Sequence, residues 1–269
     1  MRRLLIHPGF HKTGTTSIQK TLGRNRRKLA PQTEILLRPD LPSVCEWARA
    51  YSASRQAYDL LGFRHELTET LQRIADAPPR DTIISSEDLL GHMPGRRGLT
   101  GYDAAPDLMQ ALAECVAQVW RDPPQLIFYF SVRDAGPWLR SCHAQHLRTV
   151  KMELDAEAYA TAYRDSARLG RIIDLVRVAV APHRVAWGRL ETCRDLPLGP
   201  LEPLLDLLGI APETRARLKP LPPQNPALPE ALRDAYLRIN RSNLPRPEAQ
   251  RAKKEALQRW LGSAARSKG

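Results

Sequence analysis

The sequence predicts an α/β fold in which helices cover both faces of a central parallel sheet, giving three layers. Two observations support this. Short apolar segments rich in branched and aromatic residues recur along the chain, and segments with helical periodicity lie between them. Strands that alternate with helices favour a parallel sheet whose two faces are both buried. A chain of 269 residues is long enough to bury a large core.

Five segments are predicted as strands. Four are short and apolar enough for buried strands, whereas the fifth, TEILL at 33–37, is weaker. In chain order the predicted strands are 3–7, 33–37, 81–86, 125–132 and 183–188.

Helical periodicity follows the strands. Leu108 and Leu112 keep to one face of their segment, and Ile172, Leu175 and Val176 do so in a longer one. A glycine just after the last periodic residue is a common helix end. The predicted helices are 17–29, 106–120, 157–181 and 198–210, the last closed by Gly209.

Two regions break the alternation. Residues 91–103, rich in glycine and basic residues, predict a loop, and residues 219–229 are rich in proline. Composition offers no second core beyond them. We therefore expect one domain over 1–218 and, over 219–269, a proline-rich connection followed by a basic helical extension.

The overall charge favours anionic partners. Lys and Arg number 41 and Asp and Glu 29, which gives a net charge of +12. A basic solvated surface explains this balance equally well. The four cysteines form no C-x-x-C pair, which fits a reducing, cytoplasmic setting, and no apolar run reaches the length of a membrane span.

The most informative stretch is HPGFHKTGTTSIQ at 7–19, which links the first strand to a helix. Gly14 permits a tight turn and a close approach of the backbone to an anion. Amides at a helix start, with the hydroxyls of Thr13, Thr15 and Thr16, can donate to phosphate oxygens. Lys12 adds a point charge. The stretch predicts a phosphate-binding loop, although a turn with capping threonines and a solvated lysine has the same residues.

The position of the lysine argues against an ATPase. The usual phosphate loop reads G-x-x-x-x-G-K-[ST], with the lysine directly after the second glycine. Here Lys12 precedes Gly14 by two residues. The loop therefore favours a different phosphate-bearing ligand.

The same stretch resembles the 5′-phosphosulfate loop of sulfotransferases that use 3′-phosphoadenosine-5′-phosphosulfate (PAPS), and it is most similar to the bacterial branch, in which H-K-T-G-T-T-S-x-Q is common. The resemblance implies a P-loop fold. It also implies that Lys12 contacts the 5′-phosphate and the oxygen that bridges to sulfur, while Thr13, Gly14, Thr15 and Thr16 hold that phosphate. His11, beside Lys12, could touch substrate or phosphate, or could simply shape the loop.

The resemblance also implies an arginine at the end of a central strand and a serine eight residues later, both on the 3′-phosphate. Arg133 ends the strand 125–132, and Ser141 follows at that spacing. Pro137 suits the first turn of the intervening helix. Alternatively, Arg133 forms a local ion pair with Asp134 and Ser141 is an ordinary helix residue.

The chain departs from the family in one respect. It has no clear K-G-x-x-G motif like that of the animal cytosolic enzymes, which leaves the adenosine contacts unassigned. Basic residues at 95–98, or Arg148 and Lys151, could substitute on charge alone.

Transfer to a hydroxyl requires a group that accepts its proton. Glu87 follows the strand 81–86 at the edge where open α/β sheets place ligands, and S-S-E at this position also resembles the bacterial family. We expect Glu87 to be the base. Capping of the next turn by Glu87 and Asp88 is the alternative, His92 is the rival base, and Glu34 is a more remote one.

No metal is expected. Cys142, His143 and His146 do not match a zinc-binding spacing, and no second ligand pair accompanies them. The chain also lacks the acidic strand end that would hold magnesium beside a lysine–serine loop.

Taken with the resemblance, these residues predict an enzyme that transfers a sulfuryl group from PAPS to an acceptor hydroxyl or amine, with adenosine 3′,5′-bisphosphate as the product. The acceptor would be a small molecule or a carbohydrate. A nucleotide kinase or triphosphatase is the alternative enzyme. A basic nucleic-acid-binding protein is the non-catalytic alternative, but interleaved aromatic residues and a recognisable nucleic-acid module are missing, so no nucleic acid is expected as a partner.

Overall fold

The computed structural model describes residues 2–221 and 228–266. The chain divides into two compact units, one formed by 1–134 and 168–224 and the other by 135–167 and 225–269. The first unit contains the sheet, and the described residues of the second form helices and the loops between them.

The sheet has five strands in the order β2-β3-β1-β4-β5, and every neighbouring pair is parallel. Apolar runs such as Leu4–Leu5–Ile6 form its centre because both faces are covered, and these three side chains are at most 1% exposed. All five predicted strands are confirmed. Their bounds are β1 (Arg3–His7), β2 (Thr33–Leu37), β3 (Asp81–Ser85), β4 (Gln125–Val132) and β5 (Arg184–Arg189).

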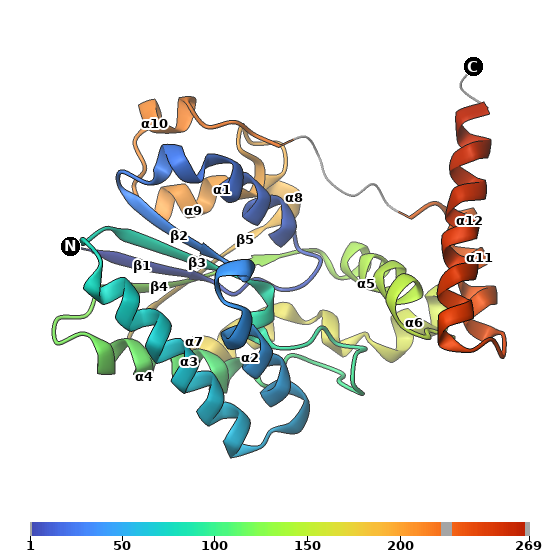
Figure 1. Cartoon of the computed structure of the whole chain (residues 1–269), viewed down its shortest axis with the longest axis horizontal. Helices are drawn as coiled ribbons and strands as arrows, with labels where there is room; N and C mark the ends of the chain where they lie inside the picture. The colour runs from blue at the N-terminus through green and yellow to red at the C-terminus, as the bar shows by residue number, and fades with distance from the viewer. Residues whose placement is uncertain (1, 222–227, 267–269) are drawn as a thin grey trace. The chain divides into compact units, whose positions relative to one another are not determined.

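Helices lie on both faces of the sheet, so the predicted three-layer α/β architecture is confirmed (Figure 1). One face carries α1 (Thr15–Leu29), α9 (Glu202–Leu207) and α10 (Pro212–Ala216), and the other carries α2 (Pro42–Ser54), α3 (Ala57–Asp76), α4 (Ala105–Val119) and α7 (Leu169–Ala179). Short helical turns complete the unit. They are η1 (Arg38–Asp40), η2 (Glu87–Leu90), α8 (Leu190–Cys193) and η4 (Gly199–Leu201).

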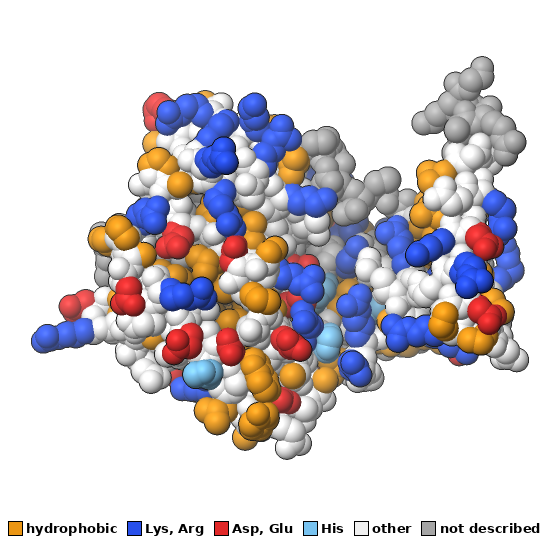
Figure 2. All heavy atoms as spheres, viewed as in Figure 1, with side chains coloured by type: hydrophobic (Ala, Val, Ile, Leu, Met, Phe, Trp, Pro, Cys, Tyr) orange, Lys and Arg blue, Asp and Glu red, His pale blue; other side chains and the backbone are white. Residues whose placement is uncertain are grey.

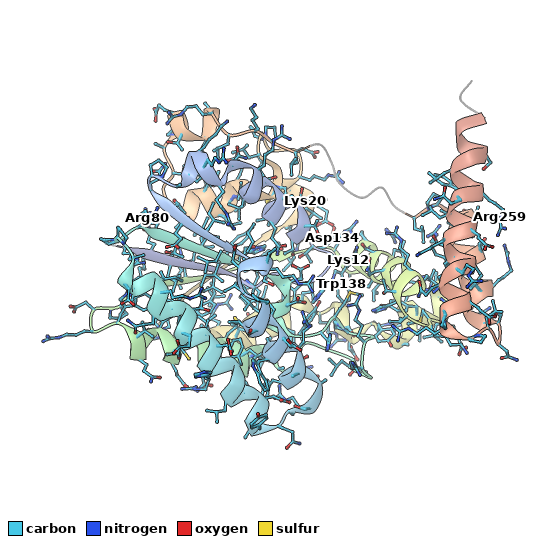
Figure 3. All side chains as sticks on the ribbon, in the orientation of Figure 1. Lys12, Lys20, Arg80, Asp134, Trp138 and Arg259 are labelled. Carbon is cyan, nitrogen blue, oxygen red and sulfur yellow. The ribbon has the colours of Figure 1, made fainter. Side chains whose placement is uncertain are left out.

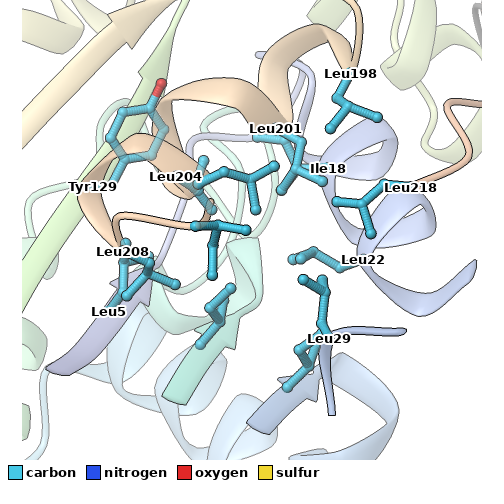
Figure 4. Packing of buried hydrophobic residues seen from close by; sticks show 14 residues of the cluster. Leu5, Ile18, Leu22, Leu29, Tyr129, Leu198, Leu201, Leu204, Leu208 and Leu218 are labelled. Carbon is cyan, nitrogen blue, oxygen red and sulfur yellow. The ribbon is translucent and has the colours of Figure 1, made fainter. Parts of the chain in front are cut away.

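A leucine-rich cluster joins the sheet to α1 and α9 (Figure 4). Leu5 and Ile83 from the strands meet Ile18 and Leu22 of α1, and Leu204 of α9 closes the cluster. Because successive strand residues point to opposite faces, His7 and Ser85 at the strand ends face the same side as Leu5 and Ile83. This packing fixes the start of α1 over the ends of the strands.

The predicted helices differ from the observed ones in three places. One continuous helix over 157–181 is wrong, because the structure has α6 (Ala156–Ala162), the turn η3 (Asp165–Ala167) and then α7. The break coincides with the boundary between the two units at 167/168. The segment 198–210 contains η4 and α9, and Gly209 follows α9 with a positive φ of 53°. The predicted elements also leave 38–80 without a helix, where the structure has α2 and α3.

The second unit is formed by α5 (Ala135–Thr149), α6, η3, α11 (Glu230–Arg241) and α12 (Arg246–Arg266). Pro137 lies in the first turn of α5, as expected. In α11, Leu232 and Tyr236 are buried, and the amide of Asn240 donates to the carbonyl oxygen of Leu147 at 3.3 Å. Apolar burial on one face of α11 thus attaches the C-terminal helices to α5.

The predicted domain boundary between 218 and 219 stays a prediction. Residues 222–227 of the proline-rich connection lie outside the described residues. The structure does group the basic C-terminal helices with α5 and α6, an association that the sequence did not indicate.

Candidate active site

The candidate site lies at the carboxyl ends of the strands. β1 sits between β3 and β4, and the helices that follow β1 and β3 cover opposite faces of the sheet (Figure 1). Open α/β sheets bind ligands at such a reversal. Lys12 and Asp134, which follow β1 and β4, lie at this end of the sheet, whereas Arg80, which precedes β3, lies at the other end (Figure 3).

The loop between β1 and α1 has an uncommon backbone. Gly9, Lys12 and Gly14 all have positive φ, of 56°, 69° and 95°. This conformation suits glycine but costs a lysine free energy, and such residues concentrate at functional sites. A Cβ atom on Gly14 would stand 2.8 Å from Cδ1 of Leu190. The left-handed conformation therefore favours glycine at 14, and a larger residue would also have to displace the Leu190 methyl group.

A buried network of polar side chains supports the loop. The Thr13 hydroxyl donates to the Phe10 carbonyl oxygen at 2.6 Å and lies 2.8 Å from Oγ of Ser131. The same Ser131 oxygen lies 3.3 Å from Nε2 of His7. His7 is fully buried, and its Nδ1 is 2.8 Å from Oγ of Ser85. Burial lowers the pKa of His7 from 6.5 to about 3, so this ring is neutral and structural.

The three threonines differ in what they can offer a ligand. Like that of Thr13, the hydroxyl of Thr15 donates to the Phe10 carbonyl oxygen, at 3.0 Å, and both side chains are buried. Thr16 is exposed. At the start of α1, Ser17 N–H and Ile18 N–H both donate to the Gly14 carbonyl oxygen. The earlier amides have no partner within the helix, so Thr13 and Thr15 can serve a ligand through their N–H groups.

Arg133 is brought next to the loop. Its Nη1 donates to the carbonyl oxygen of Lys12 at 3.4 Å, although the two residues are 121 positions apart. Its Nε is buried without a hydrogen-bond acceptor among the described residues, and Oε1 of Glu191 lies 3.7 Å away. The local ion pair of Arg133 with Asp134, considered as the alternative, is absent from the described part of the chain. Asp134 instead pairs with Arg189 at 3.5 Å.

Ser141 lies on α5, in the other unit. The boundary between the units falls directly after Asp134. A phosphate group shared by Arg133 and Ser141 therefore stays a prediction.

Glu87 lies beside the helix that follows the loop. It begins η2, and its Oε2 accepts a hydrogen bond from the Gln19 side chain on α1 at 2.8 Å. Its side chain is half-buried. The predicted base is thus held about one turn along the helix that the loop begins.

His92 lies near several basic residues. Its N–H donates to Oγ of Ser52 at 2.9 Å. Burial is the main cause that lowers the pKa of its imidazole, and the charges of Arg49 and Arg96 add to this. The ring is therefore neutral at pH 7 and could accept a proton, so both candidate bases remain.

Asp88 has a role other than the capping that the sequence offered as an alternative. The cap of η2 is Ser86, whose hydroxyl accepts from Asp88 N–H at 3.3 Å. The Asp88 side chain is buried, and its Oδ1 lies 3.8 Å from Nε2 of His11. Burial opposes ionisation, but the nearby His11 and the charges of Arg49 and Arg38 hold the pKa of Asp88 below its usual value.

His11 is anchored on both sides. Its N–H donates to the Tyr102 hydroxyl at 3.1 Å, and Nδ1 lies at the same distance from that oxygen. Tyr102 is buried and belongs to the predicted loop 91–103, which forms neither helix nor strand. This contact ties the loop to the residue beside Lys12.

Sequence reasoning missed Gln19, Ser131 and Glu191, and it considered Asp88 only as a capping residue. Gln19 lies inside the stretch given for the family resemblance, and Asp88 directly follows S-S-E, so their polar side chains could have marked them as candidates. Nothing local connects Ser131 or Glu191 with the loop, because their neighbours come from distant segments.

Within residues 2–221 and 228–266, no helix is both long and apolar enough to cross a membrane.

A scan against models of known protein families finds no match, and a search of curated proteins finds none either. Among solved structures, an unliganded sugar kinase from Janibacter sp. HTCC2649 matches with a TM-score of 0.37 and 14% identity, over 80% of this chain and 98% of that chain. A likeness this weak carries no conclusion about activity, so the site's chemistry rests on its own residues.

Proposed function

We propose that this protein is a sulfotransferase that moves a sulfuryl group from PAPS to a hydroxyl or amine of a small molecule or carbohydrate. One observation carries the proposal. Arg133, from the end of β4, lies against the Lys12 carbonyl oxygen in the loop that follows β1. Two cationic residues from separate strands, beside a helix start, suit a nucleotide phosphorylated at two positions.

The donor set fits such a nucleotide. Nε of Arg133 is a buried donor without an acceptor among the described residues, and the first amides of α1 have no partner within the helix. The acidic group facing Arg133 is Glu191, which a phosphate oxygen would displace from Nε. A site composed of N–H donors and cations favours phosphate over an uncharged ligand.

PAPS, when bound, would supply the sulfuryl group. Lys12 would place a positive charge at the oxygen that becomes negative as the bond to sulfur breaks. Glu87 would accept the acceptor's proton, and Gln19, which donates to Glu87 at 2.8 Å, would hold the carboxylate in position. His92 is the second candidate for this role.

The proposal can be tested by ligand-induced stabilisation. We expect adenosine 3′,5′-bisphosphate to raise the melting temperature, and Mg-ATP and a short oligonucleotide to have little effect, because a ligand stabilises the fold it binds. Stabilisation by Mg-ATP alone would instead support a kinase or triphosphatase. Stabilisation by the oligonucleotide alone would support a nucleic-acid-binding protein.

Arg133→Ala should weaken bisphosphate binding roughly tenfold or more, as expected for loss of a hydrogen bond to a charged group. Calorimetric titration measures the change. Arg189→Ala is the matched control, because Arg189 also pairs with an acid at this sheet end and its side chain is 57% exposed. Equal affinities of the two variants would contradict the role of Arg133.

Glu87→Ala should keep bisphosphate affinity and lower turnover about 100-fold or more, the usual contribution of a general base. Turnover is measured as bisphosphate released with an active acceptor. If Glu87→Ala keeps full turnover, Glu87 is not the base. A loss of turnover in His92→Ala would then identify the His92 imidazole as the base.

A further inference from the structure

A second basic cluster lies at the carboxyl ends of β2 and β3. The two strands are paired, with Leu37 opposite Ser85. Arg38 begins the turn after β2, and Asp88 lies in the turn after β3. Arg49 reaches the same place from α2. Three separate elements, η1, α2 and η2, therefore bring two arginines to one carboxylate.

The cluster is organised around Asp88. Nε of Arg38 and Nη1 of Arg49 each lie 2.6 Å from the same oxygen, Oδ2 of Asp88. The Asp88 side chain is 8% exposed, whereas those of Arg38 and Arg49 are 57% and 26% exposed. The carboxylate thus lies beneath two guanidinium groups that solvent can reach.

The charges in this cluster do not cancel. Two guanidinium groups share a single carboxylate, and each carries five N–H donors in a fixed fork. Arg96 and Arg97, from the loop 91–103, add positive charge close enough to act on His92. The acid nearest in sequence, Glu87, is hydrogen-bonded to Gln19. Within the described part of the chain, Arg38 and Arg49 therefore carry more positive charge than Asp88 balances, and they have further guanidinium N–H groups beyond those that contact its carboxylate.

The cluster is also connected to the transfer site. His11 lies 3.8 Å from Asp88 Oδ1 and directly precedes Lys12, and Glu87 directly precedes Asp88. His11 and Asp88, the residues next in sequence to the loop lysine and the candidate base, therefore link the arginine cluster to the loop.

We infer that Arg38 and Arg49, held in place by Asp88, bind an oxyanion of the acceptor, so that the acceptor is a small anionic molecule carrying a carboxylate, sulfate or phosphate group as well as its reacting hydroxyl. This inference rests on the proposed sulfotransferase function. Burying the Asp88 carboxylate costs desolvation free energy, and two arginines offset that cost while keeping donors for a ligand. Asp88 is a positioning residue and does not touch the acceptor.

The experiment uses the full chain saturated with adenosine 3′,5′-bisphosphate, so that the loop anion site is filled. Glucuronate, glucose 6-sulfate and glucose 6-phosphate are titrated at constant ionic strength, with glucose as the uncharged comparison. At least one anionic sugar should bind more tightly than glucose, and Arg49→Gln should weaken that binding roughly tenfold or more. Arg55→Gln is the control, because Arg55 caps the C-terminus of the same helix and pairs with Asp107 instead.

Arg38→Gln gives a second variant if Arg49→Gln fails to fold, since its side chain is more exposed and its loss leaves the Asp88–Arg49 pair intact. The inference is overturned if no anionic sugar exceeds glucose, or if the arginine variants bind as the control does. A separate result would contradict the proposed sulfotransferase function. In that case adenosine 3′,5′-bisphosphate does not raise the melting temperature of the wild-type protein, regardless of which sugars bind.

Discussion

At the scale of single residues, buried polar groups fix the geometry of the loop. His7, Ser131 and Thr13 form a chain of contacts beneath it, and none of the three is more than 2% exposed. Buried polar groups are costly unless they are satisfied, so this network specifies one loop conformation. His7 takes part in this network as a neutral imidazole, because its burial disfavours the protonated form.

His7 should make stability depend on pH. An exposed imidazole has a pKa of 6.5, whereas burial lowers the pKa of His7 to about 3 in the folded protein. Between these values the unfolded chain binds a proton that the folded protein excludes, so stability falls as pH falls, by about 1.4 kcal/mol per pH unit. Above the unfolded pKa the contribution is constant.

Urea unfolding at several pH values measures this slope. His7→Gln should reduce it and should also lower stability at neutral pH by about 1–2 kcal/mol, because the bonds to Ser85 and Ser131 are impaired. His65→Gln is the control, since His65 is exposed on α3. Equal slopes in wild type and His7→Gln would show that His7 is not held neutral.

At the scale of elements, the connections between strands and helices determine which residues meet at the candidate site. The turn from β1 into α1 requires a left-handed residue directly before the helix, and Gly14 provides it with φ of 95°. The turns after β2 and β3 place Arg38 and Asp88 side by side because the strands are in register. A change in one connection should therefore alter ligand binding more than the fold.

Gly14→Ala should show this. The added Cβ would lie 2.8 Å from Leu190 in a conformation unfavourable for alanine, so we expect a loss of about 1–2 kcal/mol of stability and a larger relative loss of bisphosphate affinity. Thermal melting and calorimetric titration measure the two effects. Gly170→Ala in α7 is the control, because nothing lies within 4 Å of its added Cβ and alanine favours helix. Wild-type binding by Gly14→Ala would contradict the role of this turn.

At the scale of the whole molecule, the chain has two units and a strong positive charge. Lys and Arg side chains gather over α1, α10 and α12 (Figure 2). In the helical unit, Tyr236 of α11 is 4% exposed and Asn240 bonds to α5. The unit is therefore held together by contacts between its two chain segments, 135–167 and 225–269.

Tyr236→Ala should separate the stabilities of the two units. Removing a buried aromatic ring costs about 3 kcal/mol or more, and the loss should fall on the helical unit. Native-state hydrogen exchange should show lower protection in α5 and α11 and unchanged protection in β1 and β4. Equal loss of protection in all four elements would mean that the chain unfolds as one unit.

The sequence by itself determined the strands, the parallel sheet and the position of the phosphate-loop candidate. Apolar runs, glycine and lysine act locally, so their pattern is readable without a structure. The prediction of one long helix over 157–181 was wrong because the helix is interrupted at the boundary between the two units. That boundary depends on tertiary packing, which hydrophobic periodicity does not report.

Only the tertiary structure decided which side chains meet. It placed Arg133 against Lys12, Gln19 against Glu87, and two arginines on Asp88. These pairs join segments far apart in the chain, and their contacts follow from strand order and register. HKTGTT thus predicts an anion-binding loop from the sequence, whereas the side chains that surround this loop come from other strands of the folded sheet.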